Sequence, residues 1–299
     1  FSKIACYLDL VAISIGADIV PMNGENRILA FYGLKKINTK PRESIKALMS
    51  LSTKELSNIS ISDLVFLVAP RINAAGRIKH AKKAVDILIE KDNSVTRKLA
   101  ANIDEWNNKR KLLEKKVTEE ALNGINKNSS SIVVFNSNWH KGVVGIVASR
   151  IVEAHYKPTI VLSEKDGLLT GSARSVRGFD LYHAISKCRY LCENFGGHKY
   201  AAGLSIKREN LERFIIEFEK QVKENITDSQ KTPFINIDME IKLEDINDKL
   251  IRILKQFAPF GPSNPEPVFV CRNIVCSSRF FKRALIAFTF KNSILSIRT

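Results

Sequence analysis

The sequence lacks three features, and each absence narrows its class. No stretch approaches the roughly 18 uninterrupted apolar residues of a spanning helix, which excludes a membrane bundle and predicts no membrane partner. Cysteines number only five, and their closest pairs lie four and five residues apart. This pattern predicts reduced thiols in a cytoplasmic protein rather than a disulfide framework or a zinc site. Acidic residues are also scarce, with 31 Asp and Glu against 47 Lys and Arg, a formal charge of +16.

The excess of positive charge predicts a polyanionic partner. Nucleic acid is the first candidate, ahead of a membrane surface and a ribosome-like scaffold. A content of 44% hydrophobic and 26% charged residues over 299 positions is typical of two or three globular domains. The first residue is Phe1 inside an apolar segment, so we expect a fragment that starts within a domain.

The order of apolar patterns predicts an α/β chain in four segments. Helical runs fill 1–80, and a 3–4 spacing of apolar residues through 94–123 predicts one long helix within a connecting segment, 81–128. A coiled coil is the alternative, weakened by Arg110 in the apolar stripe. Strand and helix runs alternate over 129–226, and a polar linker precedes a small β-rich domain at 233–299. Strands are expected at 132–135, 159–162, 168–173 and 201–206, and helices at 7–20, 27–37, 42–51, 62–69, 94–123, 143–154, 180–193, 208–223 and 243–257.

Two carboxylates, Asp9 and Asp18, interrupt the apolar run at 7–20. A buried carboxylate is costly unless it is hydrogen-bonded, paired or metal-bound. For Asp9, a helix cap is at least as good an explanation as any function. For Asp18, a structural role and a metal or active-site role stay equally open, because one Asp does not define a metal site.

Four basic, glycine-containing segments lie where helices and strands are expected to meet. Their candidates are Arg71, Asn73 and Arg77 in 69–78, Trp139 and His140 in 138–150, Ser172 and Arg174 in 170–180, and His198 and Lys199 beside Gly196 and Gly197 in 196–203. The paired N–H donors of an arginine guanidinium bind phosphate, and glycines let a ligand approach the backbone closely. The start of a helix offers N–H groups that are free to bind an anion. A stacking role for Trp139 or His140 competes with a core Trp and a capping His. Similarly, the segment 69–78 could be a salt-bridged surface loop, and Gly196-Gly197 a generic turn. Together, the four loops predict a shared polyanion groove.

Six segments together resemble the bacterial RecJ single-strand-specific exonucleases of the DHH phosphoesterase superfamily. They are LDLVAISIGADIVPMNGENR, APRINAAGRI, WHKGVVGIVASRI, GSARSVRGFD, FGGHKYAAG and PFGPSNPEP, in the family's order and spacing up to about residue 275. The resemblance implies that 1–80 is the back of a DHH catalytic domain, 129–226 a DHH-associated substrate-binding domain, and 233–299 an OB-like nucleic-acid-binding domain.

The resemblance also implies a 5′→3′ exonuclease that hydrolyses phosphodiester bonds with two Mn²⁺ or Mg²⁺ ions in DNA repair and recombination. Single-stranded DNA with a 5′ phosphate is the implied substrate, with a single-strand-binding protein and a helicase as possible partners. Asp18 is implied as a metal ligand and catalytic residue, and His198 as a catalytic residue near the metals. Arg71, Asn73 and Arg77 would line the DNA path, and Ser172 and Arg174 would hold the 5′ phosphate.

Three departures from the family pattern qualify these expectations. The Asp-rich motif and the DHH triplet are absent, so we expect this fragment to bind but not cleave. Ser263 stands where the family usually has Gly, and the tail after about 278 does not follow the family. Two alternatives stay open: a single-strand-binding module without catalysis, and a nanoRNA or cyclic-dinucleotide phosphodiesterase that shares the GGH segment.

Overall fold

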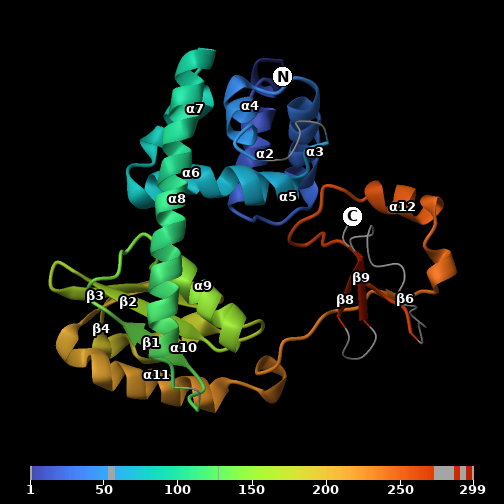
Figure 1. The fold of residues 1–299 in the computed structure, drawn as a ribbon. Helices are drawn as coiled ribbons and strands as arrows, with labels where there is room; N and C mark the ends of the chain where they lie inside the picture. Colours follow the sequence, from blue (N-terminus) through green and yellow to red (C-terminus); the bar gives the residue numbers. More distant parts are fainter. Residues whose placement is uncertain (1, 53–57, 127, 273–285, 290–293, 298–299) are drawn as a thin grey trace. The chain divides into compact units, whose positions relative to one another are not determined.

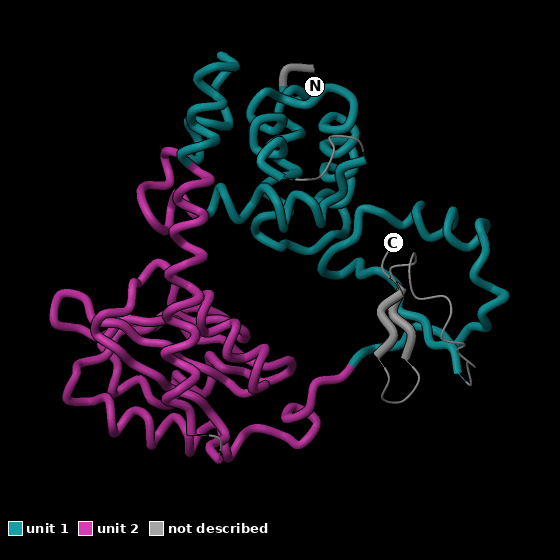
Figure 2. Tube along the Cα trace, viewed as in Figure 1, with its two compact units in different colours: residues 1–73, 84–102, 235–299 teal, residues 74–83, 103–234 magenta. Residues whose placement is uncertain are grey.

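The computed structural model describes residues 2–52, 58–126, 128–272, 286–289 and 294–297. Two compact units emerge: unit 1 holds residues 1–73, 84–102 and 235–299, and unit 2 holds 74–83 and 103–234 (Figure 2). The helices are α1 (Ser2–Ala5), α2 (Leu8–Ala17), α3 (Gly24–Thr39), α4 (Glu43–Met49), α5 (Ile61–Asp63), α6 (Ala69–Ile78), α7 (Lys82–Ile89), α8 (Asn93–Asn123), α9 (Val144–His155), α10 (Leu181–Lys187), α11 (Leu211–Asn225) and α12 (Asp248–Lys255). The strands are β1 (Ile132–Phe135), β2 (Thr159–Lys165), β3 (Leu168–Arg174), β4 (Cys192–His198), β5 (Ala201–Lys207), β6 (Met239–Glu240), β7 (Phe269–Val270), β8 (Ile286–Thr289) and β9 (Ile294–Ile297).

In unit 1, α2 and α3 pack closely through small residues. A Cβ on Gly33 would lie 2.6 Å from the Cβ of Ala12 and would overlap the carbonyl oxygen of Leu8, so only glycine allows this approach. Ala12 and Ala30 are fully buried beside it. The helices expected at 7–20, 27–37 and 42–51 are confirmed as α2, α3 and α4.

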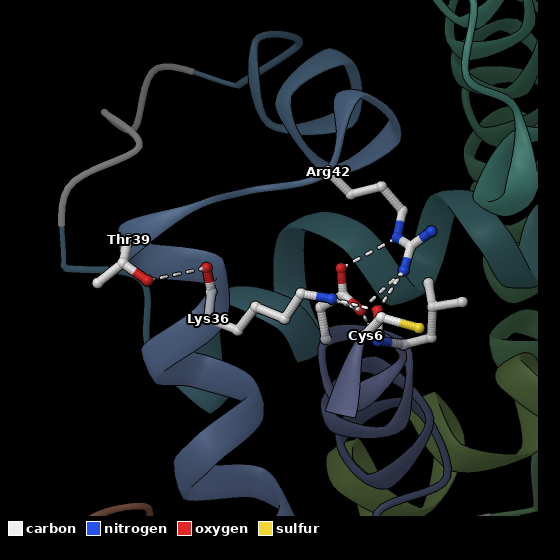
Figure 3. A network of polar contacts seen from close by, with 6 residues as sticks. Cys6, Lys36, Thr39 and Arg42 are labelled. Carbon is white, nitrogen blue, oxygen red and sulfur yellow. Dashed lines mark hydrogen bonds and ion pairs between the residues drawn. The ribbon is translucent and has the colours of Figure 1, made fainter. Parts of the chain in front are cut away.

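A buried ion-pair network ties α2 to α3 and α4 (Figure 3). The Asp9 carboxylate accepts from Lys36 Nζ at 3.1 Å and from Arg42 Nε at 3.0 Å, and both cations also donate to the Cys6 carbonyl. Burial raises the pKa of Asp9, but the hydrogen bonds from Arg42 and Lys36 outweigh it and hold that pKa below its ordinary value. Asp9 lies inside α2 rather than at its N-cap, so a cap does not explain it; its role is structural.

The segment 69–78 is a helix, which corrects the expectation of a loop there and of a helix that ends before Pro70. Ser60 caps α5 with a capping box, and a π-helical turn over Leu64–Val68 leads directly into α6. The Ala69 N–H donates to the Leu64 carbonyl five residues back. This shift of register immediately before Pro70 lets the chain continue as a helix through a residue that has no N–H to donate.

Unit 2 is built on a five-stranded sheet with the order β1-β2-β3-β5-β4, in which only β1 and β2 are parallel (Figure 1). On one face, Val161 packs with Val147 and Ile151 of α9. On the other face, Ala173 and Leu204 pack with residues of α10 and α11. Four expected strands are confirmed as β1, β2, β3 and β5, which establishes the predicted α/β fold class.

The helix expected over 180–193 is wrong in its second half. α10 ends at Lys187, a short 3₁₀ turn covers Arg189–Leu191, and β4 follows. β4 forms an edge of the sheet and pairs only with β5, its partner in a hairpin. The sequence of this glycine-rich edge strand shows no clear alternation of apolar and polar residues. Its pairing with β5 therefore decides its conformation.

The long helix expected over 94–123 is confirmed as α8, which begins in unit 1 and ends in unit 2. Arg110 interrupts the apolar stripe of this helix but does not end the helix, because Arg110 pairs with Glu114 four residues later on the same helix face. None of the helices in the described ranges combines the length and apolar character needed to cross a bilayer.

The C-terminal residues of unit 1 form two small β-pairs, β6 with β7 and β8 with β9, which do not close into a barrel in the part of the chain that the structure describes. The helix expected over 243–257 is shorter, a 3₁₀ turn at Leu243–Asp245 followed by α12. Ser263 has φ +65, which explains why glycine suits this position. Most of the tail after 278 lies outside the described residues.

Candidate nucleic-acid interface

The start of α9 meets the end of β3 in an anion-binding arrangement. Val143, the N-cap of α9, makes no side-chain cap, so the first N–H groups of the helix have no side-chain acceptor. A Cβ on Gly145 would lie 3.2 Å from both Arg174 Nη2 and Ser172 Oγ, so these polar groups face the first turn of α9 directly. Arg174 Nη1 is held by Ser172 Oγ at 2.7 Å and by the Ala173 carbonyl at 2.8 Å. The segment 170–180 therefore supplies a fixed guanidinium and a hydroxyl beside a positive helix end. We call Ser172, Arg174 and Gly145 the terminal pocket.

A second arginine adds positive charge to the terminal pocket. Arg77 Nη1 donates to the Gly142 carbonyl at 3.1 Å, and the Arg77 backbone approaches Gly142 so closely that no Cβ would fit there. Burial lowers the pKa of Arg174, and the charge of Arg77 lowers it further. Neither arginine pairs with a carboxylate among the described residues. Two neighbouring cations that form no direct ion pair with a carboxylate favour a bound anion.

Arg110 extends this positive cluster, although sequence reasoning noted it only as an interruption. Desolvation lowers the pKa of Arg77, the charge of Arg110 lowers it further, and Glu114 opposes them. Glu114 is shared, because it accepts from Arg110 Nη1 at 3.0 Å and from Arg150 Nε at 3.2 Å. Arg150 also pairs with Glu153 at 3.0 Å, so two carboxylates stand against the four arginines Arg77, Arg110, Arg150 and Arg174, and the cluster keeps a net positive charge.

An open floor of small residues extends from the terminal pocket across the sheet. Directly opposed residues of antiparallel strands share a face, and Arg174, Ala201 and His198 form one such row across β3, β5 and β4. Ser172, Gly203 and Gly196 form the next row on the same face. Gly196 and Gly203 are exposed, and a Cβ on Gly196 would meet nothing within 4 Å. We call Gly196, Ala201 and Gly203 the glycine shelf.

His198, the last residue of β4, and Lys199, in the turn between β4 and β5, lie at the far end of the shelf. The Lys199 and Tyr200 carbonyls accept backbone N–H bonds from Leu181 at 3.0 Å and from Ser175 at 3.1 Å, so the turn is fastened to the segment after β3. Both side chains are exposed. Gly196, Gly197 and His198 belong to β4 rather than to a loop, and Gly197 is no generic turn residue. At φ +148, a Cβ on Gly197 would lie 2.5 Å from the Ala202 Cα.

The segment 138–150 enters a helix as expected, but Trp139 is not available for stacking on a base. It is 7% exposed, packs in the core beneath α9, and donates Nε1–H to Glu120 at 2.8 Å. His140 is exposed, and its Nδ1 accepts the Gly142 N–H at 3.0 Å. His140 therefore shapes the turn before α9 and keeps an exposed ring edge.

The remaining candidates belong to unit 1. Arg71 is half-buried and donates to the carbonyls of Leu67 and Leu51 at 2.5 and 3.0 Å, while Asn73 is exposed on α6. Asp18 is the exposed C-cap of α2. The described ranges contain no group of three or more His, Cys, Asp or Glu side chains that could hold a metal ion.

Comparison with known proteins connects these features to one family. The sequence model of the DHHA1 domain matches residues 128–224, and that of the RecJ OB domain matches 237–298. The single-stranded-DNA-specific exonuclease RecJ of Bacillus subtilis is 37% identical over 273 residues, which are 90% of this chain and 35% of that protein. The RecJ of Escherichia coli is 34% identical over 280 residues, 89% of this chain and 48% of that protein.

The fold agrees with solved RecJ structures. Crystal structures of RecJ from Thermus thermophilus in complex with Mg²⁺ and with Mn²⁺ both give a TM-score of 0.80 at 28% identity. The matched regions cover 88% and 89% of this chain, and 41% and 39% of the two RecJ chains. The chain thus spans between a third and a half of the length of these curated relatives. Its two matched domains, its similarity across about nine-tenths of its length and its shared fold place the chain in the RecJ family.

Proposed function

We propose that this chain is the substrate-binding part of a single-stranded-DNA-specific 5′→3′ exonuclease that acts in DNA repair and recombination. The observation that carries this proposal is the terminal pocket, in which Ser172 and Arg174 face the uncapped first turn of α9. The names of the relatives and the charge of +16 support a single-stranded DNA substrate.

The terminal pocket suits a 5′ phosphate better than an internal diester. A phosphate monoester carries about −1.5 to −2 charges at pH 7, and an internal diester carries one. Arg174 and Arg77 supply two cations without carboxylate partners among the described residues, and free N–H groups of α9 supply donors. A monoester therefore balances the local charge more completely than a diester does.

The glycine shelf gives the strand a path away from the terminal pocket. Without side chains on Gly196 and Gly203, a sugar-phosphate backbone can lie against the sheet between Arg174 and His198. His198 and Lys199 then contact the nucleotides that follow the terminal phosphate. In this proposal Arg71, Asn73 and His140 contact the strand farther along, without recognising its end.

RecJ from Thermus thermophilus was solved in complex with Mg²⁺ and with Mn²⁺. In this proposal, two such ions would activate water and stabilise the leaving oxygen when bound. Asp18 is the one residue of this chain that we assign to such a centre. Since the described residues supply no further ligand group around it, we propose that this chain binds single strands without cleaving them.

The division into segments 1–80, 81–128, 129–226 and 233–299, with α8 as the connector, belongs to the same proposal. So do a cytoplasmic location and partnership with a single-strand-binding protein and a helicase.

Binding measurements on the 299-residue chain test this function. Fluorescently labelled single strands with a 5′ phosphate or a 5′ hydroxyl are titrated in EDTA, and the same strands are then incubated with Mn²⁺. We expect tighter binding of the phosphorylated strand and no product. Equal affinity for both strands would refute end recognition, and preferential binding of dinucleotides would favour the nanoRNA or cyclic-dinucleotide alternative. Cleavage with Mn²⁺ would show that the chain carries a complete metal centre.

A further inference from the structure

The segment 256–264, which contains most of the motif PFGPSNPEP, folds into a self-contained turn that the proposed function does not use. We call it the clip. Asn264 Nδ2 donates to the carbonyls of Phe257 at 3.0 Å and Pro259 at 2.9 Å. Gly261 and Asn264 exchange backbone hydrogen bonds of 2.9 and 3.0 Å. These bonds join residues of the clip to one another.

The clip contacts the loop that carries Asp18. The Met22 N–H donates to the Pro262 carbonyl at 2.5 Å, and the Met22 side chain is 1% exposed. A Cβ on Gly261 would lie 3.0 Å from the Met22 Cβ and 3.2 Å from its Cε, so glycine leaves the space that Met22 fills. The two segments come from opposite ends of the sequence, and this contact joins them within unit 1.

Arg27 forms a second link, from α3 to the end of α12. Its Nη2 donates to the carbonyls of Phe257 at 3.1 Å and Gln256 at 3.3 Å, directly after the last turn of α12. The final carbonyls of a helix carry partial negative charge, which favours a cation there. Among the described residues, Arg27 forms no ion pair with a carboxylate, so its charge serves this link.

We propose that Arg27 and the clip form a joint that holds loop 18–23 and the end of α12 as one body. Asp18 closes α2 through its N–H bond to the Ser14 carbonyl, and only a few residues separate it from Met22. The loop is thus held by α2 at one end and by the clip at the other. Arg27 is a positioning residue, and the C-terminal segment is a structural support for the Asp18 loop. This inference does not depend on nucleic-acid binding.

Hydrogen–deuterium exchange on the 299-residue chain tests the joint, with peptides covering 17–24 and 256–265 as the readout. Arg27→Gln removes the cation and its bonds. The matched control Arg252→Gln removes the same charge from an exposed site on α12. A hydrogen bond to a charged group is worth about 1.5–3 kcal/mol, so we expect exchange in both peptides to rise roughly tenfold or more in R27Q and to stay unchanged in R252Q.

A second variant, Gly261→Val, opens the joint from the other side, because its side chain would occupy the space of Met22. We expect the same two peptides to exchange faster while the α9 and β3 peptides keep their protection. Wild-type exchange in both R27Q and G261V would overturn the proposal. A uniform rise across all peptides of unit 1 would also overturn it, since that result would make Arg27 a general stability residue and not part of a local joint.

Discussion

Replacing Arg174 by Ala removes the guanidinium of the terminal pocket and should separate end recognition from general strand binding. Arg174 Nη1 is already engaged by Ser172 Oγ and the Ala173 carbonyl, which leaves Nη2, beside Gly145, for the phosphate. One charge-assisted bond is worth about 1.5–3 kcal/mol, or roughly a ten- to 150-fold loss of affinity. We expect this loss for a 5′-phosphorylated strand and a clearly smaller one for a 5′-hydroxyl strand.

The assay is fluorescence anisotropy of the 299-residue chain with both strand types in EDTA at fixed salt, because affinity for single strands depends steeply on salt. Arg213→Ala is the matched control, since Arg213 is exposed on α11, which packs against the opposite face of the sheet. Arg174→Lys keeps the positive charge but loses the paired N–H donors of the guanidinium. Its affinity for the phosphorylated strand should therefore lie between those of wild type and R174A. Thermal unfolding of each variant checks that the pocket still folds. Equal losses for the two strand types in R174A would refute the reasoning.

Five other positions give further tests. Arg71→Ala should weaken the binding of both strand types alike. It should also reduce the slope of log affinity against log salt concentration by about 0.7, the value for one phosphate contact on a single strand. A loss confined to phosphorylated strands would contradict the assignment of Arg71. Asp9→Asn should cost about 3 kcal/mol in urea unfolding at pH 7, because it leaves Lys36 and Arg42 without their buried carboxylate. Because the folded pKa of Asp9 is depressed, its stabilisation is present above its ordinary pKa of 3.8 and is lost as pH falls through the folded value. The gap between wild type and D9N should therefore narrow below about pH 4, and a gap that stays constant down to about pH 2 would count against the network. Ser263→Gly should raise the free energy of unfolding by about 0.5–1 kcal/mol, because φ +65 is unfavourable for a residue with a Cβ; an unchanged urea midpoint would speak against strain there. Gly197→Ala should destabilise by about 1–3 kcal/mol, because its Cβ would collide with Ala202, while Gly196→Ala, whose Cβ meets open space, should leave the melting temperature unchanged.

The anion-binding candidates of unit 2 were predictable from local chemistry. Ser172, Arg174 and the entry to α9 combine hydroxyl, guanidinium and free N–H groups, and these residue types are readable in any sequence. Their convergence was not predictable. Gly145 lets α9 lie close to β3, and no spacing in the sequence indicates that a Cβ at this position would lie 3.2 Å from side-chain atoms of both Ser172 and Arg174.

Where backbone hydrogen bonding competes with the preferences of the residue types, the sequence alone was misleading. The segment 69–78 contains proline, asparagine and glycine, which are typical of a loop, but the π-helical turn before Pro70 carries it into a helix. Residues 192–198 follow a helix and carry two glycines, yet the ladder with β5 makes them an edge strand. Backbone hydrogen bonding to the neighbouring strand of a hairpin decided this conformation, which the residue types of 192–198 do not encode by themselves.

The sequence by itself determined the fold class, the long helix α8, four of the strands in the main sheet and the family resemblance. These depend on periodicity, charge and motif order, which are properties of neighbouring residues. Only the tertiary structure decided that Trp139 is core, that Asp9 is a buried ion-pair partner, that Arg77 stands beside Arg174, and that the clip holds Met22. Each of these depends on burial or on contact between distant segments, and burial and contact are set only when the chain packs.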